Sequence, residues 1–348
     1  MDQRRDHLGH WARQMLSQQL SNDMTPAVLS MVSGDASFRR YFRLTLAGQS
    51  WICVDAPADK EDNPAFVRIA SQWRASGVSV PAVLAQDFEL GFMLLEDFGD
   101  RLLWPALHDS TATDETRAAL YQQAIDELLL IQKVSATDLP AYDEALLQRE
   151  MDLFTDWLCT RLLGMTLCDD EVAMFNAVRA ELVRSALAQP VVTVHRDYHS
   201  RNLMLCTGGD MGEPSGDHIG VIDFQDAVAG PVTYDLVSLL RDCYVHWSPH
   251  LVQELLVYYY RAASEQDIHG MPLPDFTRAF DLMGLQRHLK AAGIFARLSL
   301  RDGKDGYLAS IPNTCRYLHD VSVQYPEFSE FSHWLETRFM PALEVKGL

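Results

Sequence analysis

The apolar pattern of the chain changes its period near residue 98. Before that point, segments 38–46 and 50–55 are rich in aromatic and β-branched residues, and a turn signal at 47–49 joins them. This combination is typical of a β-hairpin. Two further short apolar stretches, 81–85 and 91–96, also have the composition of strands. The first part of the chain therefore predicts a small antiparallel sheet.

One helix is expected between these strands. Asn63 is a favourable N-cap, Pro64 suits the first helical position, and Gly77 ends the pattern. The intervening apolar residues share one helical face, which consists of Phe66, Ile69, Ala70 and Trp73. We expect this face to pack against the sheet.

Beyond residue 98 the apolar residues recur mostly with helical spacing. Three long stretches show this pattern before residue 190, namely 114–133, 144–163 and 169–188. The sequence thus predicts an α+β fold with two lobes. A β-rich N-lobe with an N-terminal helix spans 1–98, and a larger, mostly helical C-lobe spans 99–348.

An island of strand and loop pattern interrupts the helical part between residues 190 and 224. It holds the spacing H-x-D-x-x-x-x-N, formed by His195, Asp197 and Asn202, and Asp223 follows 26 residues after Asp197. Phosphoryl transfer needs a carboxylate to orient the acceptor hydroxyl and hard oxygen ligands to hold Mg²⁺. We therefore expect Asp197, Asn202 and Asp223 to face one cleft.

This pattern resembles the kinase-like phosphotransferases, which include the aminoglycoside phosphotransferases and choline kinases. The resemblance runs from about residue 30 to about residue 300. It implies a protein-kinase-like fold, ATP as donor, Asp197 as catalytic base, and Asn202 and Asp223 as Mg²⁺ ligands. His195 would support the loop. Asp235, in the element G-x-P-x-x-D-L, would begin a helix and hold the catalytic loop in place.

Two segments of the N-lobe are candidates for nucleotide binding. Segment 33–42 lies between two strands, where Gly34 allows close approach of the backbone and Ser37 can donate to phosphate. Segment 93–98 lies at the junction of the lobes and would bind adenine through its backbone and side chains, with contributions from Met93, Leu95, Glu96 and Phe98.

The strand at 51–55 lacks the lysine that protein-kinase-like enzymes place there, and it ends in Asp55. Arg39, Arg40 and Arg43 are candidates for the missing cation. Alternate residues of a strand share a face, so Arg39 and Arg43 would act together and Arg40 would point away. A pseudokinase scaffold that binds nucleotide without turnover is an alternative, although the intact Asp197 motif favours activity.

The acceptor is predicted to be a small molecule, because no A-P-E segment or long activation loop follows Asp223. The sequence resembles one branch more closely, the bacterial anomeric kinases of N-acetylmuramate and N-acetylglucosamine in peptidoglycan recycling. The runs that carry this likeness include 33–44, 54–66 and 195–204. It implies phosphorylation of the C1 hydroxyl. An aminoglycoside or another amino alcohol is the alternative acceptor. Candidate acceptor contacts are Arg201, Asp226 and Tyr234.

The formal net charge of −19 argues against nucleic acid and anionic membranes as partners, because repulsion would oppose binding. Six scattered cysteines show neither zinc-site nor disulfide spacing. No apolar run is long enough to form a membrane helix, and the N-terminal stretch lacks the apolar core of a signal peptide. We expect a cytoplasmic protein whose partner is a small amino sugar, and no obligate protein partner is evident.

Overall fold

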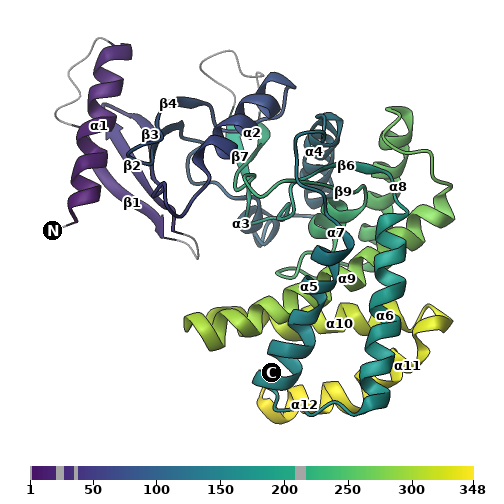
Figure 1. Ribbon diagram of the computed structural model, residues 1–348. Coiled ribbons are helices and arrows are strands. Elements are labelled where there is room, and N and C mark those ends of the chain that lie inside the picture. Colours follow the sequence, from purple (N-terminus) through teal and green to yellow (C-terminus); the bar gives the residue numbers. More distant parts are fainter. Residues whose placement is uncertain (1, 21–26, 35–37, 208–216) are drawn as a thin grey trace. The chain divides into compact units, whose positions relative to one another are not determined.

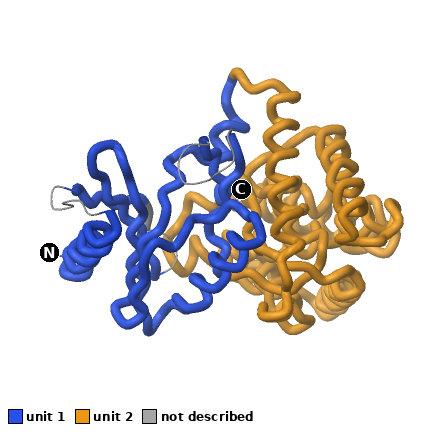
Figure 2. Tube along the Cα trace, turned by 90° about the horizontal axis from the view of Figure 1, so that it is seen from above, with its two compact units in different colours: residues 1–110, 201–225 blue, residues 111–200, 226–348 orange. Residues whose placement is uncertain are grey.

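The computed structural model describes residues 2–20, 27–34, 38–207 and 217–348 (Figure 1). The chain forms two compact units (Figure 2). Unit 1 consists of Met1–Ser110 with Arg201–Gln225, and unit 2 consists of Thr111–Ser200 with Asp226–Leu348. Each unit is described by itself below.

Unit 1 contains the predicted antiparallel sheet, with five strands in the order β1-β2-β3-β5-β4. Their bounds are β1 (Val28–Gly34), β2 (Arg40–Leu46), β3 (Gln49–Asp55), β4 (Val83–Asp87) and β5 (Phe92–Glu96). Helix α1 (Gln3–Leu20) covers one face of this sheet (Figure 1). The strand periodicity explains the core. Phe42 and Leu44 of β2 pack with Leu8 and Leu16 of α1, whereas Tyr41 and Arg43 line a pocket.

Helix α2 (Asn63–Ala75) begins with a cap that differs by one residue from the predicted one. Asp62 is the N-cap, and its side chain accepts a hydrogen bond from Ala65 N at 3.0 Å. Asn63 is 1% exposed and donates through Nδ2 to the Ala56 carbonyl at 2.8 Å. The prediction of Asn63 as cap was therefore wrong. Both side chains can cap a helix, but only the first residue outside the turn is placed to do so.

Two short hairpins come from the island in the sequence. In unit 1, β7 (Leu203–Thr207) pairs with β8 (Asp217–Val221), and Leu203 lies opposite Val221. In unit 2, β6 (Val191–Val194) pairs with β9 (Val228–Pro231). Because β7 and β8 are antiparallel, the residue before β7 and the residues after β8 come to the same end of their hairpin.

Unit 2 is mainly helical. Its longest helix is α9 (Leu273–Asp302), which packs against α5, α6, α7 and α10 and is buried over much of its length. The helices of this unit are α4 (Asp114–Lys133), α5 (Glu144–Leu153), α6 (Asp169–Leu187), α7 (Tyr234–Leu240), α8 (Pro249–Glu265), α9, α10 (Ile311–Ser322), α11 (Ser329–Trp334) and α12 (Met340–Lys346); unit 1 adds α3 (Leu103–Leu107). A π-helical segment, Phe154–Leu162, extends α5.

Gly293 shows how closely α9 packs. A Cβ atom at this position would lie 2.3 Å from the backbone carbon of Leu153, so only glycine fits there. In the part of the chain that the structure describes, no helix combines the length and the apolar character needed to cross a membrane.

Candidate active site

Asp235 holds the start of the loop that carries Asp197. Its carboxylate accepts hydrogen bonds from the backbone N–H groups of His195, at 2.6 Å, and Arg196, at 3.0 Å. Asp235 is fully buried, and burial raises its pKa to about 6 even though His195 and the two N–H groups favour the charged form. These two donors would have no partner without the carboxylate, so Asp235 fixes the backbone where the loop begins.

The remaining loop residues are held by side chains from several elements of unit 2. His195 Nδ1 accepts from the Asp197 N–H at 3.2 Å, and Tyr198 Oη donates to the Ala124 carbonyl at 2.7 Å. Ser200 Oγ donates to Asp242 at 2.6 Å. Arg196 adopts a left-handed backbone conformation, with φ 77°, which a loop tolerates only when its surroundings fix it. His195 is thus a positioning residue, because it contacts the loop and does not line a cavity.

Asp197 lines a cavity of about 270 Å³ within unit 2. Tyr234 from α7 lines it too, as do the loop residues His199 and Asp242. A single face of α9 supplies much of the wall, with Arg287, Lys290, Ala291, Ile294 and Leu298 at helical spacing. Aromatic residues complete the wall, namely Tyr244, Phe295 and Tyr307. The cavity therefore combines a carboxylate, two cationic side chains and an aromatic surface.

The charge state of Asp197 suits a base. Burial alone would raise the pKa of this carboxyl, but Lys290, His199 and Arg287 outweigh that effect and hold the pKa below its usual value. Asp197 is therefore ionised at neutral pH and can accept a proton.

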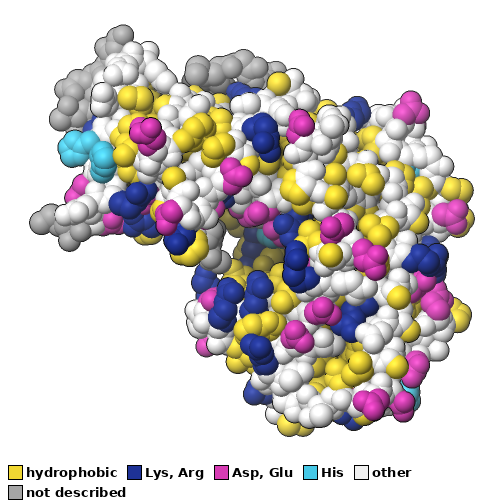
Figure 3. Space-filling view, in the orientation of Figure 1, with side chains coloured by type: hydrophobic (Ala, Val, Ile, Leu, Met, Phe, Trp, Pro, Cys, Tyr) yellow, Lys and Arg dark blue, Asp and Glu magenta, His cyan; other side chains and the backbone are white. Residues whose placement is uncertain are grey.

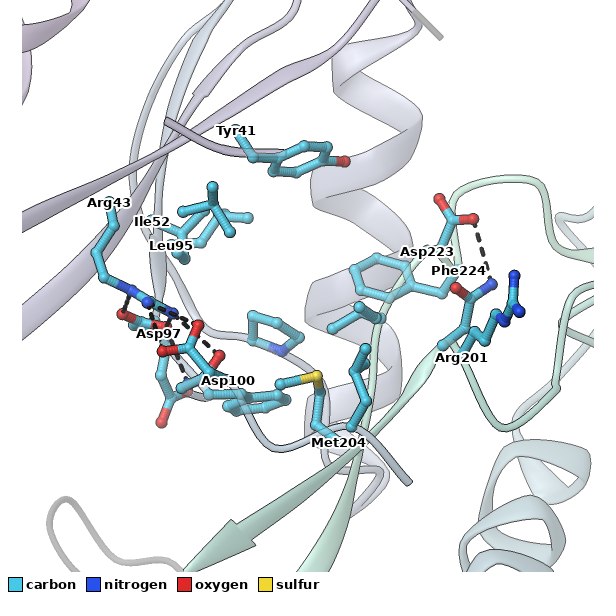
Figure 4. Close-up of a pocket in the computed structure, with 18 of the residues that line it drawn as sticks. Tyr41, Arg43, Ile52, Leu95, Asp97, Asp100, Arg201, Met204, Asp223 and Phe224 are labelled. Carbon is cyan, nitrogen blue, oxygen red and sulfur yellow. Dashed lines mark hydrogen bonds and ion pairs between the residues drawn. The ribbon is translucent and has the colours of Figure 1, made fainter. Parts of the chain in front are cut away.

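A second pocket, of about 380 Å³, lies within unit 1 (Figure 4). Arg43, Leu95, Glu96 and Phe98, all predicted to bind nucleotide, line it. Its other walls come from the sheet, from α2 and from the β7–β8 hairpin, and include Val32, Tyr41, Ile52, Phe66, Pro81, Leu102, Met204 and Ile222. Ile52 and Leu95 face the pocket from the sheet, and Met204 faces it from the hairpin (Figure 4). This apolar slot has the shape and chemistry that a planar base requires.

Asn202 and Asp223 meet at one end of the β7–β8 hairpin. Asn202 Nδ2 lies 3.4 Å from Asp223 Oδ2, and Gln225 Nε2 donates to Asp223 Oδ1 at 2.8 Å. Asp223 has φ 66°, a left-handed conformation that is strained for a residue with a side chain. Phe224, the next residue, packs on Phe66 with their ring centroids 4.9 Å apart, which holds this turn in place.

The donor set of this pair fits Mg²⁺. An amide oxygen and a carboxylate are hard ligands, and Mg²⁺ usually takes one or two protein oxygens and completes its shell with water and phosphate. Among the described residues no cluster of three or more His, Cys, Asp or Glu side chains could hold a metal. The pair Asn202 and Asp223 therefore matches a magnesium–nucleotide site better than an all-protein metal cage.

The three arginine candidates for the missing lysine all have carboxylate partners. Arg43 pairs with Asp97 at 2.5 Å and with Asp100 at 2.7 Å. Arg39 pairs with Glu61 at 3.1 Å and lies over the Phe66 ring. Arg40 pairs with Asp55 at 2.5 Å, on the side of the sheet that carries α1. Arg43 alone of the three lines the pocket.

The other predicted site residues are distributed as follows. Gly34 ends β1 opposite Arg40, and Ser37 lies outside the described residues. Met93 is fully buried and does not line the pocket. Arg201 lines the pocket of unit 1, with its guanidinium 5.1 Å from the centre of the Trp104 ring. Asp226 is exposed and lines neither cavity.

The sequence analysis missed the contribution of α9. Arg287 and Lys290 are three residues apart in a helix that is otherwise mainly apolar at its buried positions. Two cations on the buried face of a helix are unusual, since burying a charge is costly unless it is paired. That spacing was the available signal.

The solved structures that resemble this chain define its class. A choline/ethanolamine kinase family protein from Mesorhizobium loti matches with a TM-score of 0.61 at 16% identity, over 92% of this chain and 97% of that one. At such low identity the match concerns the fold, which is the choline-kinase-like, two-lobed fold predicted from the sequence.

The family follows from the sequence itself. The model of the phosphotransferase enzyme family matches residues 28–273, and the chain belongs to this family. A protein of Pseudomonas aeruginosa named N-acetylmuramate/N-acetylglucosamine kinase is 45% identical over 90% of this chain and 89% of its own. A protein of the same name from Pseudomonas putida is 43% identical over 87% of this chain and 86% of its own. The predicted resemblance is confirmed, and the chain is a phosphotransferase.

Replacing Asp235 by alanine is expected to lower the free energy of unfolding by roughly 2–4 kcal/mol, because two buried N–H groups lose a charged acceptor. Chemical denaturation measures this quantity. Asp138→Ala, which removes an exposed loop carboxylate, is the matched control and should change it by less than about 0.5 kcal/mol. Equal stability of the two variants would contradict the anchoring role of Asp235.

Proposed function

We propose that this protein transfers the γ-phosphoryl group of ATP to the anomeric C1 hydroxyl of N-acetylmuramate and N-acetylglucosamine, amino sugars derived from peptidoglycan. The observation that carries this proposal is the identity of 45% and 43% to two kinases of that name, over about nine-tenths of the chain. Six free cysteines support a reducing compartment, and we propose the cytoplasm.

In this proposal Asp197 accepts the proton of the C1 hydroxyl. The sugar oxygen then forms a bond to the γ-phosphorus, the bond from that phosphorus to the β,γ-bridging oxygen breaks, and ADP leaves. An anomeric hydroxyl is more acidic than an ordinary alcohol, so a carboxylate is an adequate base. The lowered pKa of Asp197 and its place in a cavity with polar and aromatic walls support this role.

The pocket of unit 1 would hold the adenine base between Ile52 and Leu95 on one side and Met204 on the other. Asn202 and Asp223 would hold Mg²⁺, which when bound neutralises charge on the nucleotide phosphates. The local geometry supports this assignment, because the antiparallel register of β7 and β8 presents both oxygen donors at the same hairpin end.

An acceptor panel tests the proposal. ADP release with Mg·ATP would be measured for N-acetylmuramate, N-acetylglucosamine, kanamycin and choline. We expect the two amino sugars to give kcat/KM values far above those of the other two acceptors. Turnover of kanamycin or choline alone would overturn the sugar assignment, and binding of ATP without turnover of any acceptor would favour a nucleotide-binding scaffold.

A further inference from the structure

We propose that Arg287 binds the carboxylate of N-acetylmuramate and so determines the preference of this enzyme for that acceptor over N-acetylglucosamine. This inference rests on the proposed function. The two sugars share the ring, the acetamido group and the C1 hydroxyl. N-acetylmuramate adds one feature, a lactyl ether at O3 that ends in a carboxylate. A site that distinguishes them must recognise a negative charge some distance from the reacting oxygen.

Arg287 lies in the right cavity for this task. It lines the same space of about 270 Å³ as Asp197, and both belong to unit 2. Along α9 the cavity wall continues through Lys290, Ala291 and Ile294, one helical face that leads away from Arg287. An acceptor whose C1 hydroxyl faces Asp197 therefore shares its cavity with the Arg287 guanidinium.

The pairing of the neighbouring cations sets Arg287 apart. Lys290 pairs with Glu150 at 3.1 Å and donates to Tyr234 Oη at 2.8 Å. Arg196 also pairs with Glu150, at 2.7 Å. These two cations of unit 2 thus already have a carboxylate, and that carboxylate is itself buried.

Arg287 has no ion pair with any described carboxylate, although it is only 6% exposed. Its one hydrogen bond to a described residue runs from Nη1 to Cys243 Sγ at 3.6 Å, and its Nε has no hydrogen-bond partner among the residues described. A buried guanidinium without such a partner is costly, and a carboxylate can satisfy two of its N–H groups at once. The unsatisfied donors point to an anionic ligand.

The acidic residues of the cavity do not take this place. Both oxygens of Asp242 are engaged: Oδ2 accepts from Ser200 and Oδ1 accepts from the Tyr244 N–H at 2.9 Å. Asp197 attracts Arg287 through space and forms no ion pair with it. Asp197 is also the group that the reaction protonates, so its charge is not a permanent partner for the guanidinium.

The surface of this unit favours an anionic acceptor as well. Figure 3 shows Lys and Arg side chains gathered on one face of the molecule, over the C-terminal part of α9. That part of the chain carries Arg297, Arg301 and Lys304. In a chain with a net charge of −19, this local excess of positive charge attracts an anion toward the helix that lines the cavity.

The test compares three acceptors, namely N-acetylmuramate, its uncharged methyl ester and N-acetylglucosamine. The wild type is expected to use the acid better than the ester. Arg287→Gln should lower kcat/KM for the acid by about 10- to 100-fold, and for the other two acceptors far less. Arg287→Lys, which keeps the charge but loses the bidentate geometry, should lie between them. Arg301→Gln, on the exposed end of the same helix, is the control and should leave the ratio of acid to ester unchanged.

Each outcome decides the matter. Turnover of N-acetylglucosamine by Arg287→Gln shows that the variant is folded, and an equal loss for all three acceptors would overturn the inference while the proposed function stands. If that variant does not fold, the wild-type enzyme decides, because equal use of acid and ester means that the carboxylate is not bound. Turnover of none of the three by the wild type would overturn the proposed function itself, and the inference with it.

Discussion

Replacing Asp197 by asparagine is expected to lower turnover by roughly 10²–10⁴-fold, the usual contribution of a positioned general base. Asparagine fills the same space but cannot accept the hydroxyl proton. The pocket that we assign to the nucleotide consists of residues of unit 1, and Asp197 belongs to unit 2. The KM for ATP should therefore change little, and steady-state kinetics with varied ATP separates the two parameters.

The exposed loop carboxylate Asp138 again provides the matched control, and Asp138→Ala should keep wild-type turnover. Because nearby cations hold the pKa of Asp197 below its usual value, its loss of charge should not limit the wild-type rate at neutral pH. Unchanged turnover of Asp197→Asn would exclude this residue as the base.

Replacing Asp223 by asparagine is the second change with a large expected effect. A bound metal contributes several kcal/mol to charge stabilisation in the transition state, so we expect turnover to fall roughly 10²–10⁴-fold. The Mg²⁺ concentration at half-maximal rate should rise as well, because a neutral amide is a weaker ligand than a carboxylate. Titration of activity with Mg²⁺ at fixed ATP measures both effects.

Asparagine is a suitable replacement at this position because the backbone of Asp223 is left-handed, with φ 66°, and asparagine tolerates that conformation better than most residues. The melting temperature should therefore stay close to that of the wild type. A variant with full activity and an unchanged Mg²⁺ requirement would contradict the metal-binding role. A variant that is inactive only because it unfolds would be recognised from its melting curve.

The fold could be predicted from sequence where local signals and periodicity agree. In β2, Phe42 and Leu44 alternate with Tyr41 and Arg43, and this pattern alone separates the α1 side of the sheet from the pocket side. The cap of α2 marks the limit of such signals. Asp62 and Asn63 are adjacent and chemically similar, and the bond from Asn63 to Ala56 that decides between them is a tertiary contact.

The candidate site was only partly predictable. The spacing of Asn202 and Asp223 indicated a shared end of a hairpin, which the register of β7 and β8 explains. The partners of Arg43 could not be foreseen, because Asp97 and Asp100 approach it only once β5 has paired with β3. Arg287 comes from a helix about 90 residues beyond the catalytic loop, with no motif around it. The lobe boundary at residue 98 and the functional roles of all these residues stay predictions.

The position of the transferred phosphate tests the central claim most directly. The protein would be incubated with Mg·ATP and N-acetylglucosamine or N-acetylmuramate, and the products followed by ³¹P NMR. The methyl glycoside of N-acetylglucosamine, in which C1 has no free hydroxyl, is the matched control. Our account predicts a sugar-1-phosphate signal from both free sugars and none from the glycoside. Phosphorylation of the glycoside, or a signal from another hydroxyl of the free sugars, would contradict it.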